Sequence, residues 1–383
     1  MNKAEPLSIF QDVVEKPLNS YLERWISDGG KCVGYYCSLI PAEIFTAAGI
    51  VPYRVRGGGS KSTSLADVYL SSHVCSFVRH TVNLALEGEF DFLNGIVGMN
   101  GCDHSRRAYD VWERKRKAPF HTFLSVPRTQ TESLIGWYKE ELERLIKAVE
   151  NHFSVRLGPQ ELLEAIKLHN TVRKNLIKLN NLRKEPTPPI SGSEALTINI
   201  AAHLMPPEDF NKLVEQLIET LDGNKATREY RARLIVTGGE IDEPEFIKII
   251  EEQGGLVVGE DICFGSFYHE DLVSEEGDPL TKIAERYFYR VPCARMVNGF
   301  PARYEHLERL KRDFQADGVI AQRLKFCIIN AGYLHNLRQR ARINEIPTLF
   351  LEREYLASGI GQVRTRVQAF IESIEPKHEG EVK

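Results

Sequence analysis

The strongest constraint on the fold is an alternation of short apolar runs with helix-like segments near both ends of the chain. In the first third of the sequence, the apolar runs that look like strands are Val33–Tyr36, Ile50–Tyr53, Leu93–Val97 and Phe120–Val126. Residues 77–86 and 105–115 lie between these runs and have the apolar spacing of helices, as do residues 5–29 ahead of them. This alternation predicts a mostly parallel sheet that helices cover on both faces.

The middle of the chain has a different pattern, because long helical stretches follow one another from about Thr131 with few strand signals. These stretches are residues 132–152, 159–182, 194–204 and 206–222. The alternation returns near residue 230, where the strand candidates are 233–237, 256–258, 318–320, 324–326 and 348–351. We therefore predict an α/β fold with an N-terminal lobe and helical arm at 1–130, a helical domain at 131–228 and a C-terminal lobe at 229–383.

The bulk composition excludes several classes of protein. The chain has 383 residues, of which 42% are hydrophobic and 27% charged, as is typical of a globular protein. A net charge of −4 gives no reason to expect a nucleic-acid or anionic-membrane partner. The first residues lack the apolar run of a signal peptide, and no stretch approaches the roughly 20 apolar residues that span a bilayer. We expect a soluble, cytoplasmic protein.

Seven cysteines are the residues best suited to carry chemistry. Structural disulfides are rare in a reducing compartment, so each cysteine is a small buried hydrophobe, a ligand or a nucleophile. Cys75 stands just before the helical run 77–86, Cys102 follows the third apolar run, and Cys327 follows the run 324–326. All three are expected at carboxyl ends of strands or at helix starts. Doubly wound sheets bind ligands there, and a helix start favours thiolate over thiol.

The spacing of these three cysteines does not by itself identify a metal site. It matches neither the compact Cys-x-x-Cys runs of ferredoxins nor those of zinc fingers. A shared metal site and separate buried thiols therefore both remain open. The other four cysteines are expected to be buried by default, although Cys37 could point into the crevice between the lobes and Cys263 or Cys293 could line a pocket.

Ten short segments, spread over nearly the whole chain, form a recognisable set. They are Gly34–Cys37, Pro41–Ile44, Ala47–Pro52, Cys75, Gly101–Asp103, Asp317–Ile320, Lys325–Cys327, Ile346–Thr348, Leu351–Tyr355 and Arg364–Arg366. In order and spacing this set resembles the family of benzoyl-CoA reductase and 2-hydroxyacyl-CoA dehydratase cluster subunits. One departure is Ile328, which stands where the family usually has an acidic residue after the third cysteine.

The resemblance implies that Cys75, Cys102 and Cys327 bind a 4Fe–4S cluster. Its fourth iron would be left for a non-protein ligand, a substrate oxygen or another thiolate. The family fold has two flavodoxin-like parallel-sheet lobes joined by a helical segment, which agrees with the alternation described above. In length the chain is most similar to the gamma (C) subunit of ATP-dependent benzoyl-CoA reductase. That enzyme uses ferredoxin electrons to reduce benzoyl-CoA to cyclohexa-1,5-diene-1-carbonyl-CoA in anaerobic aromatic degradation.

The partners implied by this resemblance are a second cluster-bearing subunit, ATP-hydrolysing activator subunits, ferredoxin and an aromatic acyl-CoA. The sequence itself contains no G-x-x-x-x-G-K-[ST] phosphate loop, and its glycine-rich segments 56–60 and 237–240 are expected to be turns. Three alternatives remain open: a subunit of a radical 2-hydroxyacyl-CoA dehydratase, a non-catalytic electron-relay partner, and a structural zinc site.

Several polar residues near the three cysteines could take part in catalysis or binding. The candidate proton donors, which could instead only orient the loops, are His73, His104 and His335. The basic residues that could meet CoA phosphates, or form a solvated helix face, are Arg79, Arg106 and Arg107. Alanine at any of the three predicted ligands is expected to remove the cluster, whereas alanine at Cys263 or Cys293 is expected to leave it.

Overall fold

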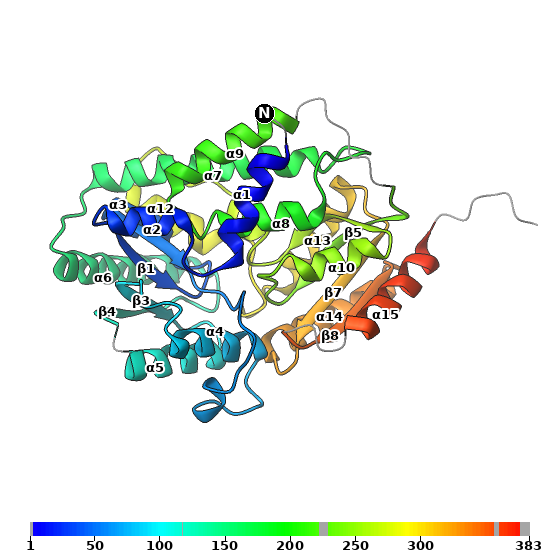
Figure 1. Ribbon diagram of the computed structural model, residues 1–383, viewed down its shortest axis with the longest axis horizontal. Helices are drawn as coiled ribbons and strands as arrows, with labels where there is room; N and C mark the ends of the chain where they lie inside the picture. The colour runs from blue at the N-terminus through cyan, green and yellow to red at the C-terminus, as the bar shows by residue number, and fades with distance from the viewer. Residues whose placement is uncertain (1–2, 117, 222–228, 356–359, 376–383) are drawn as a thin grey trace, which may run out of the picture.

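The computed structural model describes residues 3–116, 118–221, 229–355 and 360–375. It contains two four-stranded sheets, and every strand pair is parallel (Figure 1). The first sheet consists of β1 (Lys31–Tyr35), β2 (Ile50–Arg54), β3 (Gly95–Met99) and β4 (Phe120–Leu124). The second consists of β5 (Ala232–Gly238), β6 (Gly255–Asp261), β7 (Gly318–Leu324) and β8 (Thr348–Arg353). The predicted α/β class with two parallel-sheet lobes is confirmed.

Helices surround both sheets. Those before and within the first sheet are α1 (Ala4–Glu15), α2 (Ser20–Ser27), α3 (Ala42–Ala47), α4 (Ser76–Glu87) and α5 (Asp103–Arg116). The stretch between the sheets forms α6 (Ile135–Phe153), α7 (Pro159–Leu182), α8 (Gly192–Ala201) and α9 (Pro207–Leu221). The second sheet carries α10 (Glu245–Glu252), α11 (Ser266–His269), α12 (Pro279–Tyr289), α13 (Phe300–Asp313), α14 (Ile328–Ile343) and α15 (Ile360–Ile374).

The helix predicted at residues 5–29 is wrong in one respect, because the chain forms two helices there. Pro17 follows α1 and has no backbone N–H to continue its hydrogen bonding. Asn19 then caps α2, since its Oδ1 accepts hydrogen bonds from the N–H groups of Tyr21 and Leu22, both at 3.1 Å. A proline followed by a capping side chain restarts the helix in a new direction.

The separate strands predicted at 318–320 and 324–326 are also wrong, because a single strand, β7, covers Gly318–Leu324. Gln322 breaks the apolar pattern but is fully buried, and its Nε2 donates to the Gly239 carbonyl at 2.9 Å. Beyond the strand, Phe326 adopts a φ of 64°. This left-handed conformation is uncommon for a bulky residue, and it turns the chain so that Cys327 meets the start of α14.

The two lobes share a hydrophobic core and are not packed independently. One buried cluster contains Val51 and Val78 from the first lobe together with Leu196 from α8 and Leu234 and Ile320 from the second. Helix α12 follows the second sheet's β6 but packs against α6 and α7, and Figure 1 shows it near α3. The loops at the sheet edges are therefore held in one frame. The predicted boundary at 130 stays a prediction, as does the one at 228, which lies outside the described residues.

Candidate functional site

The two sheets have the same strand order and so the same kind of ligand-binding edge. The first sheet is ordered β2-β1-β3-β4 and the second β6-β5-β7-β8. In each sheet the first and third strands along the chain lie side by side. The connection after the first strand leads toward one edge of the sheet, and the connection after the third leads toward the other edge. Ligands bind at such a switch point, outside the carboxyl ends of the strands. Cys37 and Cys102 follow the two switch strands of the first sheet, and Cys327 follows β7 in the second.

The three predicted ligands stand at the N-termini of three helices. Cys75 is the N-cap of α4, Cys327 is the N-cap of α14, and Cys102 directly precedes α5. The positive end of a helix dipole stabilises a thiolate. Hydrogen bonds add to this effect, since the Ser105 N–H donates to Cys102 Sγ at 3.4 Å and Asn330 Nδ2 donates to Cys327 Sγ at 3.3 Å. These donors favour thiolate at each sulfur, but only at Cys327 is the pKa lowered in spite of burial.

The structure brings these three thiols close to one another. The Cys75 thiol donates a hydrogen bond to the Cys327 sulfur, which raises the pKa of Cys75 well above its usual value, with burial adding to the rise. The same bond lowers the pKa of Cys327 to about 6, against the effect of burial and with help from Asn330 and Arg323. Burial raises the pKa of Cys102, and the charge on Cys327 adds to that. These three residues are called the first thiol set below.

The first thiol set suits a metal cluster better than a single ion. Among the residues that the structure describes, no three His, Cys, Asp or Glu side chains are grouped as one ion would need. A cluster makes a different demand, because each thiolate binds its own iron atom and hydrogen bonds to the sulfurs tune its potential. Three thiols with N–H donors at helix starts fit that demand. The ligand assignment itself stays a prediction.

The candidate proton donors differ in their positions. His104 accepts a hydrogen bond from the Cys75 N–H through Nδ1 at 3.1 Å, and burial lowers the pKa of its imidazole. This contact joins two loops of the first thiol set, which is an orienting role. The His73 ring lies edge-on to Phe326, with 5.1 Å between centroids. His335 lies on an exposed part of α14. Among the three, only His104 contacts a residue of the first thiol set in the described structure.

The arginines considered for CoA phosphates are engaged in ion pairs. Arg79 binds both carboxylate oxygens of Asp67, each at 2.6 Å, and also contacts Thr63. Arg107 pairs with Asp110 at 2.9 Å on the exposed face of α5, while Arg106 is 4.0 Å from Asp103. The solvated-face interpretation therefore accounts for all three.

The segment around Cys327 exposes apolar side chains. Ile328, the residue that departs from the family pattern, is 75% exposed, and Phe326 is 40% exposed. Ile328 is the first residue of α14, so the first turn of this helix carries no carboxylate beside the thiolate. The departure thus alters the surface of the Cys327 loop and leaves the sulfur's own hydrogen bonds in place.

The remaining cysteines separate into two kinds. Cys32 lies in β1, is fully buried in the core, and has a pKa that burial raises to about 12. Cys37, Cys263 and Cys293 each keep partial solvent access, unlike Cys32. These three are called the second thiol set below. Burial as the default is confirmed for Cys32 and is too simple for the other three.

A residue that sequence reasoning did not single out, Glu240, lies beside Cys263 and Arg54. Its carboxyl group hydrogen bonds with the Cys263 thiol, and the charge of Cys327 also acts on it. Burial raises the pKa of this carboxyl, while Arg54, 3.7 Å from it, opposes the rise. The only signal in the sequence was the glycine-rich segment 237–240, which is a turn as expected. A Cβ at Gly238 would meet the Gln322 carbonyl oxygen, and its φ of 129° also requires glycine.

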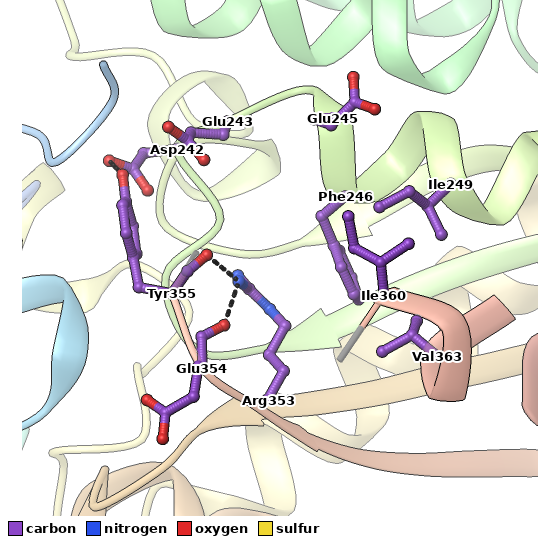
Figure 2. A pocket seen from close by; sticks show the side chains of 10 residues that line it. All are labelled: Asp242, Glu243, Glu245, Phe246, Ile249, Arg353, Glu354, Tyr355, Ile360 and Val363. Carbon is purple, nitrogen blue, oxygen red and sulfur yellow. Dashed lines mark hydrogen bonds between the residues drawn. The ribbon is translucent and has the colours of Figure 1, made fainter. Parts of the chain in front are cut away.

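A hollow between α10, the end of β8 and the start of α15 does not suit the phosphates of CoA (Figure 2). It is lined by Asp242, Glu243 and Glu354 together with apolar side chains, and burial raises the pKa of Glu243 to about 7. The one guanidinium, that of Arg353, donates to the carbonyls of Glu354 and Tyr355, as Figure 2 shows. A pocket with several carboxylates and an occupied cation repels polyanions.

Together these features define an α/β protein with two parallel-sheet lobes and a thiol-rich site where the edges of the sheets meet. A model of the 2-hydroxyglutaryl-CoA dehydratase D-component family matches residues 37–374. Because that match covers most of the sequence, the chain belongs to this family. The predicted family relationship is confirmed.

Three relatives illustrate the range of the family. The beta subunit of (R)-phenyllactyl-CoA dehydratase from Clostridium sporogenes is 25% identical over 370 residues, which cover 95% of this chain and 97% of the relative. A putative dehydratase subunit of Escherichia coli is 28% identical, covering 89% and 91%. A benzoyl-CoA reductase subunit from Thauera aromatica is 23% identical, covering 90% and 91%. All three are subunits, so family members work in complexes. Among the described residues, no helix is long and apolar enough to cross a membrane.

Proposed function

We propose that the chain holds a 4Fe–4S cluster on Cys75, Cys102 and Cys327 as one subunit of an enzyme complex that acts on an acyl-CoA. The observation that carries this proposal is the gathering of three thiols at the N-termini of α4, α5 and α14, two of them in direct contact. The family membership supports the acyl-CoA as the class of substrate. The expected partners are a second cluster-bearing subunit, ATP-hydrolysing activator subunits and ferredoxin.

The reaction predicted from the sequence is the reduction of the aromatic ring of benzoyl-CoA, which makes the complex an oxidoreductase. The likeness to the benzoyl-CoA reductase subunit from Thauera aromatica supports it. The second candidate is the dehydration of a 2-hydroxyacyl-CoA, and the matched family and two of the relatives carry dehydratase names. Both reactions need electrons of low potential that are delivered one at a time, so the same site serves either one. The ring reduction consumes two electrons and two protons, whereas the dehydration uses one electron and returns it.

Cys75, Cys102 and Cys327 would hold the cluster, and the cluster would supply electrons of low potential. The residues of this chain have three tasks. The helix starts and the Asn330 amide stabilise thiolate charge, and His104 fixes the Cys75 loop. Burial raises the pKa of the Glu240 carboxyl, and the charge of Cys327 adds to the rise. The shared core of the two lobes keeps these loops in register and limits water around them.

The decisive experiment purifies the chain without oxygen, together with its partner subunits. Iron and sulfide are counted in wild type and in the Cys75→Ala, Cys102→Ala and Cys327→Ala variants, each of which is expected to lack the cluster. A panel of acyl-CoA substrates then separates the two reactions. Consumption of ATP and electrons in proportion to benzoyl-CoA indicates the reductase, while dehydration driven by a catalytic amount of reductant indicates the dehydratase. Unchanged iron in all three variants would refute the ligand assignment.

A further inference from the structure

A series of hydrogen-bonded side chains that contains no cysteine crosses the interior of the protein. Thr46 lies near the end of α3, His169 lies in α7, and Tyr268 lies in α11. Thr46 Oγ1 is 2.8 Å from His169 Nε2, and His169 Nδ1 is 3.2 Å from the Tyr268 hydroxyl. Both nitrogens of this imidazole are therefore joined to hydroxyl groups.

A second pair of side chains continues the series toward the first sheet. His203, which follows α8, lies 3.3 Å through its Nδ1 from the hydroxyl of Tyr35, the last residue of β1. The rings of His203 and Tyr268 meet edge-on, with 4.2 Å between centroids. His203 Nε2 is buried and has no hydrogen-bond partner among the described residues. A bound water or a small rotation of this imidazole closes the step to Tyr268. Thr46, His169, Tyr268, His203 and Tyr35 are called the polar run below.

The two ends of the polar run differ in their access to solvent. Thr46 is half-buried, and Gly49 just beyond it is exposed. The other four side chains are buried, and none of them is more than 5% exposed. The polar run therefore leads from the surface beside α3 to the carboxyl end of β1, which is a switch strand of the first sheet.

The groups of the polar run are of the kind that pass protons. A neutral imidazole has a donor at one nitrogen and an acceptor at the other, and a hydroxyl both donates and accepts. Burial lowers the pKa of His169 to about 4, although the charge of Glu43 opposes the shift. Burial, with the charge of Arg54 adding to it, lowers the pKa of His203 well below its usual value. Both imidazoles are therefore neutral at pH 7 and can take up a proton at one nitrogen while they release one from the other.

A purely structural role does not account for the polar run. Glu43, one turn before Thr46 in α3, accepts hydrogen bonds from Arg173 of α7 at 2.5 Å and from the Tyr287 hydroxyl at 2.8 Å. That buried ion pair already joins α3, α7 and α12. The unpartnered nitrogen of His203 costs free energy in an arrangement whose only task is packing. A task that uses this nitrogen explains its place in the interior.

We propose that Thr46, His169, Tyr268, His203 and Tyr35 form a proton relay, which carries protons from the surface beside α3 to the interior end of β1. Each step breaks one O–H or N–H bond and forms another. A proton that leaves from Tyr35 is thus replaced by one that enters from solvent at Thr46, and each group of the relay returns to its neutral form.

The relay ends in the region that holds the buried Glu240 carboxyl. Tyr35 pairs in register with Arg54 of β2, and the Arg54 guanidinium lies 3.7 Å from Glu240. The use of the delivered protons rests on the proposed function, because ring reduction consumes two protons and dehydration moves protons as water leaves. The relay itself is a property of this chain and does not depend on which acyl-CoA the complex uses.

The first test needs neither cluster nor substrate. In the metal-free full chain with isotope-labelled histidine, nuclear magnetic resonance measures how fast the ring N–H of His203 exchanges with solvent, and His203→Gln assigns the signal. A buried N–H exchanges slowly unless the structure opens or a relay reaches it. His169→Phe and Tyr268→Phe interrupt the relay, so each is expected to slow this exchange by about 10-fold or more. A variant that only loosened the packing would speed it.

Tyr138→Phe is the matched control for this test. It removes another buried hydroxyl, which donates to the Leu39 carbonyl at 3.3 Å and lies outside the polar run. Exchange at His203 is expected to stay unchanged in this variant. Unchanged or faster exchange in both His169→Phe and Tyr268→Phe would overturn the relay, and Tyr268→Phe keeps the test open if His169→Phe does not fold.

A second measurement separates the relay from the proposed reaction. In the reconstituted complex, Tyr268→Phe is expected to lower kcat by about 10-fold and to raise the solvent deuterium isotope effect, with KM and the iron count unchanged. Slowed exchange at His203 together with wild-type kcat would overturn the link between the relay and the reaction. Slowed exchange in a chain whose complex acts on no acyl-CoA would support the relay and refute the proposed function.

Discussion

The two thiol sets lie beside different sources of positive electrostatic potential. The first thiol set lies at helix starts and receives hydrogen bonds from the Ser105 N–H and the Asn330 amide, so nearby dipoles supply the positive potential at these sulfurs. The second thiol set lies on loops. At Cys37 the N–H of Leu39 and the charges of the buried Arg54 and Arg295 lower the pKa, but burial outweighs them. Dipoles of helix ends at the first set thus contrast with full charges at the second.

This difference predicts what each thiol set needs to keep its structure in the metal-free chain. A site held by dipoles keeps its surroundings when the metal leaves, because hydrogen bonds from helix ends are part of the backbone. Buried full charges need compensation within the protein, so the loops around the second thiol set need ion pairs as supports. The chain provides one beside Cys263, where Asp261 contacts both Arg303 and His306. It provides another beside Cys37, where Glu43 pairs with Arg173 inside the protein.

The largest expected effect comes from removal of one cysteine of the first thiol set. Cys327→Ala removes the sulfur whose pKa is lowest, and with it the cluster and the activity of the reconstituted complex, which is expected to fall to background. Iron and sulfide counting and a turnover assay with the partner subunits check this outcome. Cys32→Ala is the control, since that thiol lies in the core and is expected to leave both readouts unchanged. Wild-type activity in the Cys327 variant would show that the site lies elsewhere.

Much of the first thiol set could be predicted from sequence, because strand ends and helix starts leave local signals. The positions of Cys75, Cys102 and Cys327 at helix N-termini follow from patterns within a few residues of each cysteine. The second set left no such signal. Its supporting residues, Arg54 and Arg295, come from a strand of the first lobe and a loop beyond α12, and only the crossing of α12 onto the first lobe brings them together.

The repetition of the strand order in the two lobes was also missed, because it is a repetition of topology and not of residues. The wrong strand bounds at 318–326 also had a cause in the tertiary structure. The pattern at 318–326 was broken by Gln322, which is buried in β7 through a hydrogen bond to a turn far away in the sequence. Such a contact belongs to tertiary structure, so the apolar periodicity of the strand could not report it.

The second prediction compares the thiolate fractions of the two thiol sets. In the reduced, metal-free chain, Cys327 is expected to be mostly thiolate at pH 7, because its pKa is lowered to about 6 by the hydrogen bond from Cys75. Burial raises the pKa of Cys37 and Cys263, so their thiolate fractions are small. We expect iodoacetamide to modify Cys327 about 30-fold faster than either of them, after allowance for the weaker nucleophilicity of a low-pKa thiolate. Peptide mass spectrometry over time measures the rates.

The pH dependence of this alkylation gives a further test of the prediction. The rate at Cys327 should fall as the pH drops through about 6, whereas the rates at Cys37 and Cys263 should still be rising at pH 9. Equal rates at Cys327 and Cys263 at pH 7 would mean that the two sets do not differ in the way described.

The third prediction concerns the support beside Cys263. Burial opposes protonation of His306, but hydrogen bonds to Asp261 and Glu270 outweigh it and raise the pKa of His306 to about 9, above its ordinary value of 6.5. A pKa raised on folding stabilises the protein fully below pH 6.5, and this contribution disappears as the pH rises through 9. The shift corresponds to about 3 kcal/mol at low pH.

Urea unfolding of the metal-free chain at pH 6 and pH 9.5 measures this contribution. Wild type is expected to lose up to about 3 kcal/mol more between these pH values than His306→Gln, which has no proton to lose. His335→Gln is the matched control, because that histidine lies on an exposed part of α14. Parallel pH profiles of wild type and His306→Gln would contradict the assignment of this ion-pair network as the support.

The smallest expected effect probes the dipoles of the first thiol set directly. Asn330 Nδ2 donates to Cys327 Sγ at 3.3 Å, and a donor to a ligand sulfur favours the reduced, more negative cluster. Asn330→Leu removes that donor at similar volume, so the reduction potential should become more negative by about 50 mV, which corresponds to about 1 kcal/mol for one electron. Potentiometric titration followed by electron paramagnetic resonance measures the shift. Asn330→Gln keeps an amide donor and is the matched control, with a smaller expected shift. An unchanged potential in Asn330→Leu would contradict a role of this amide at the ligated sulfur.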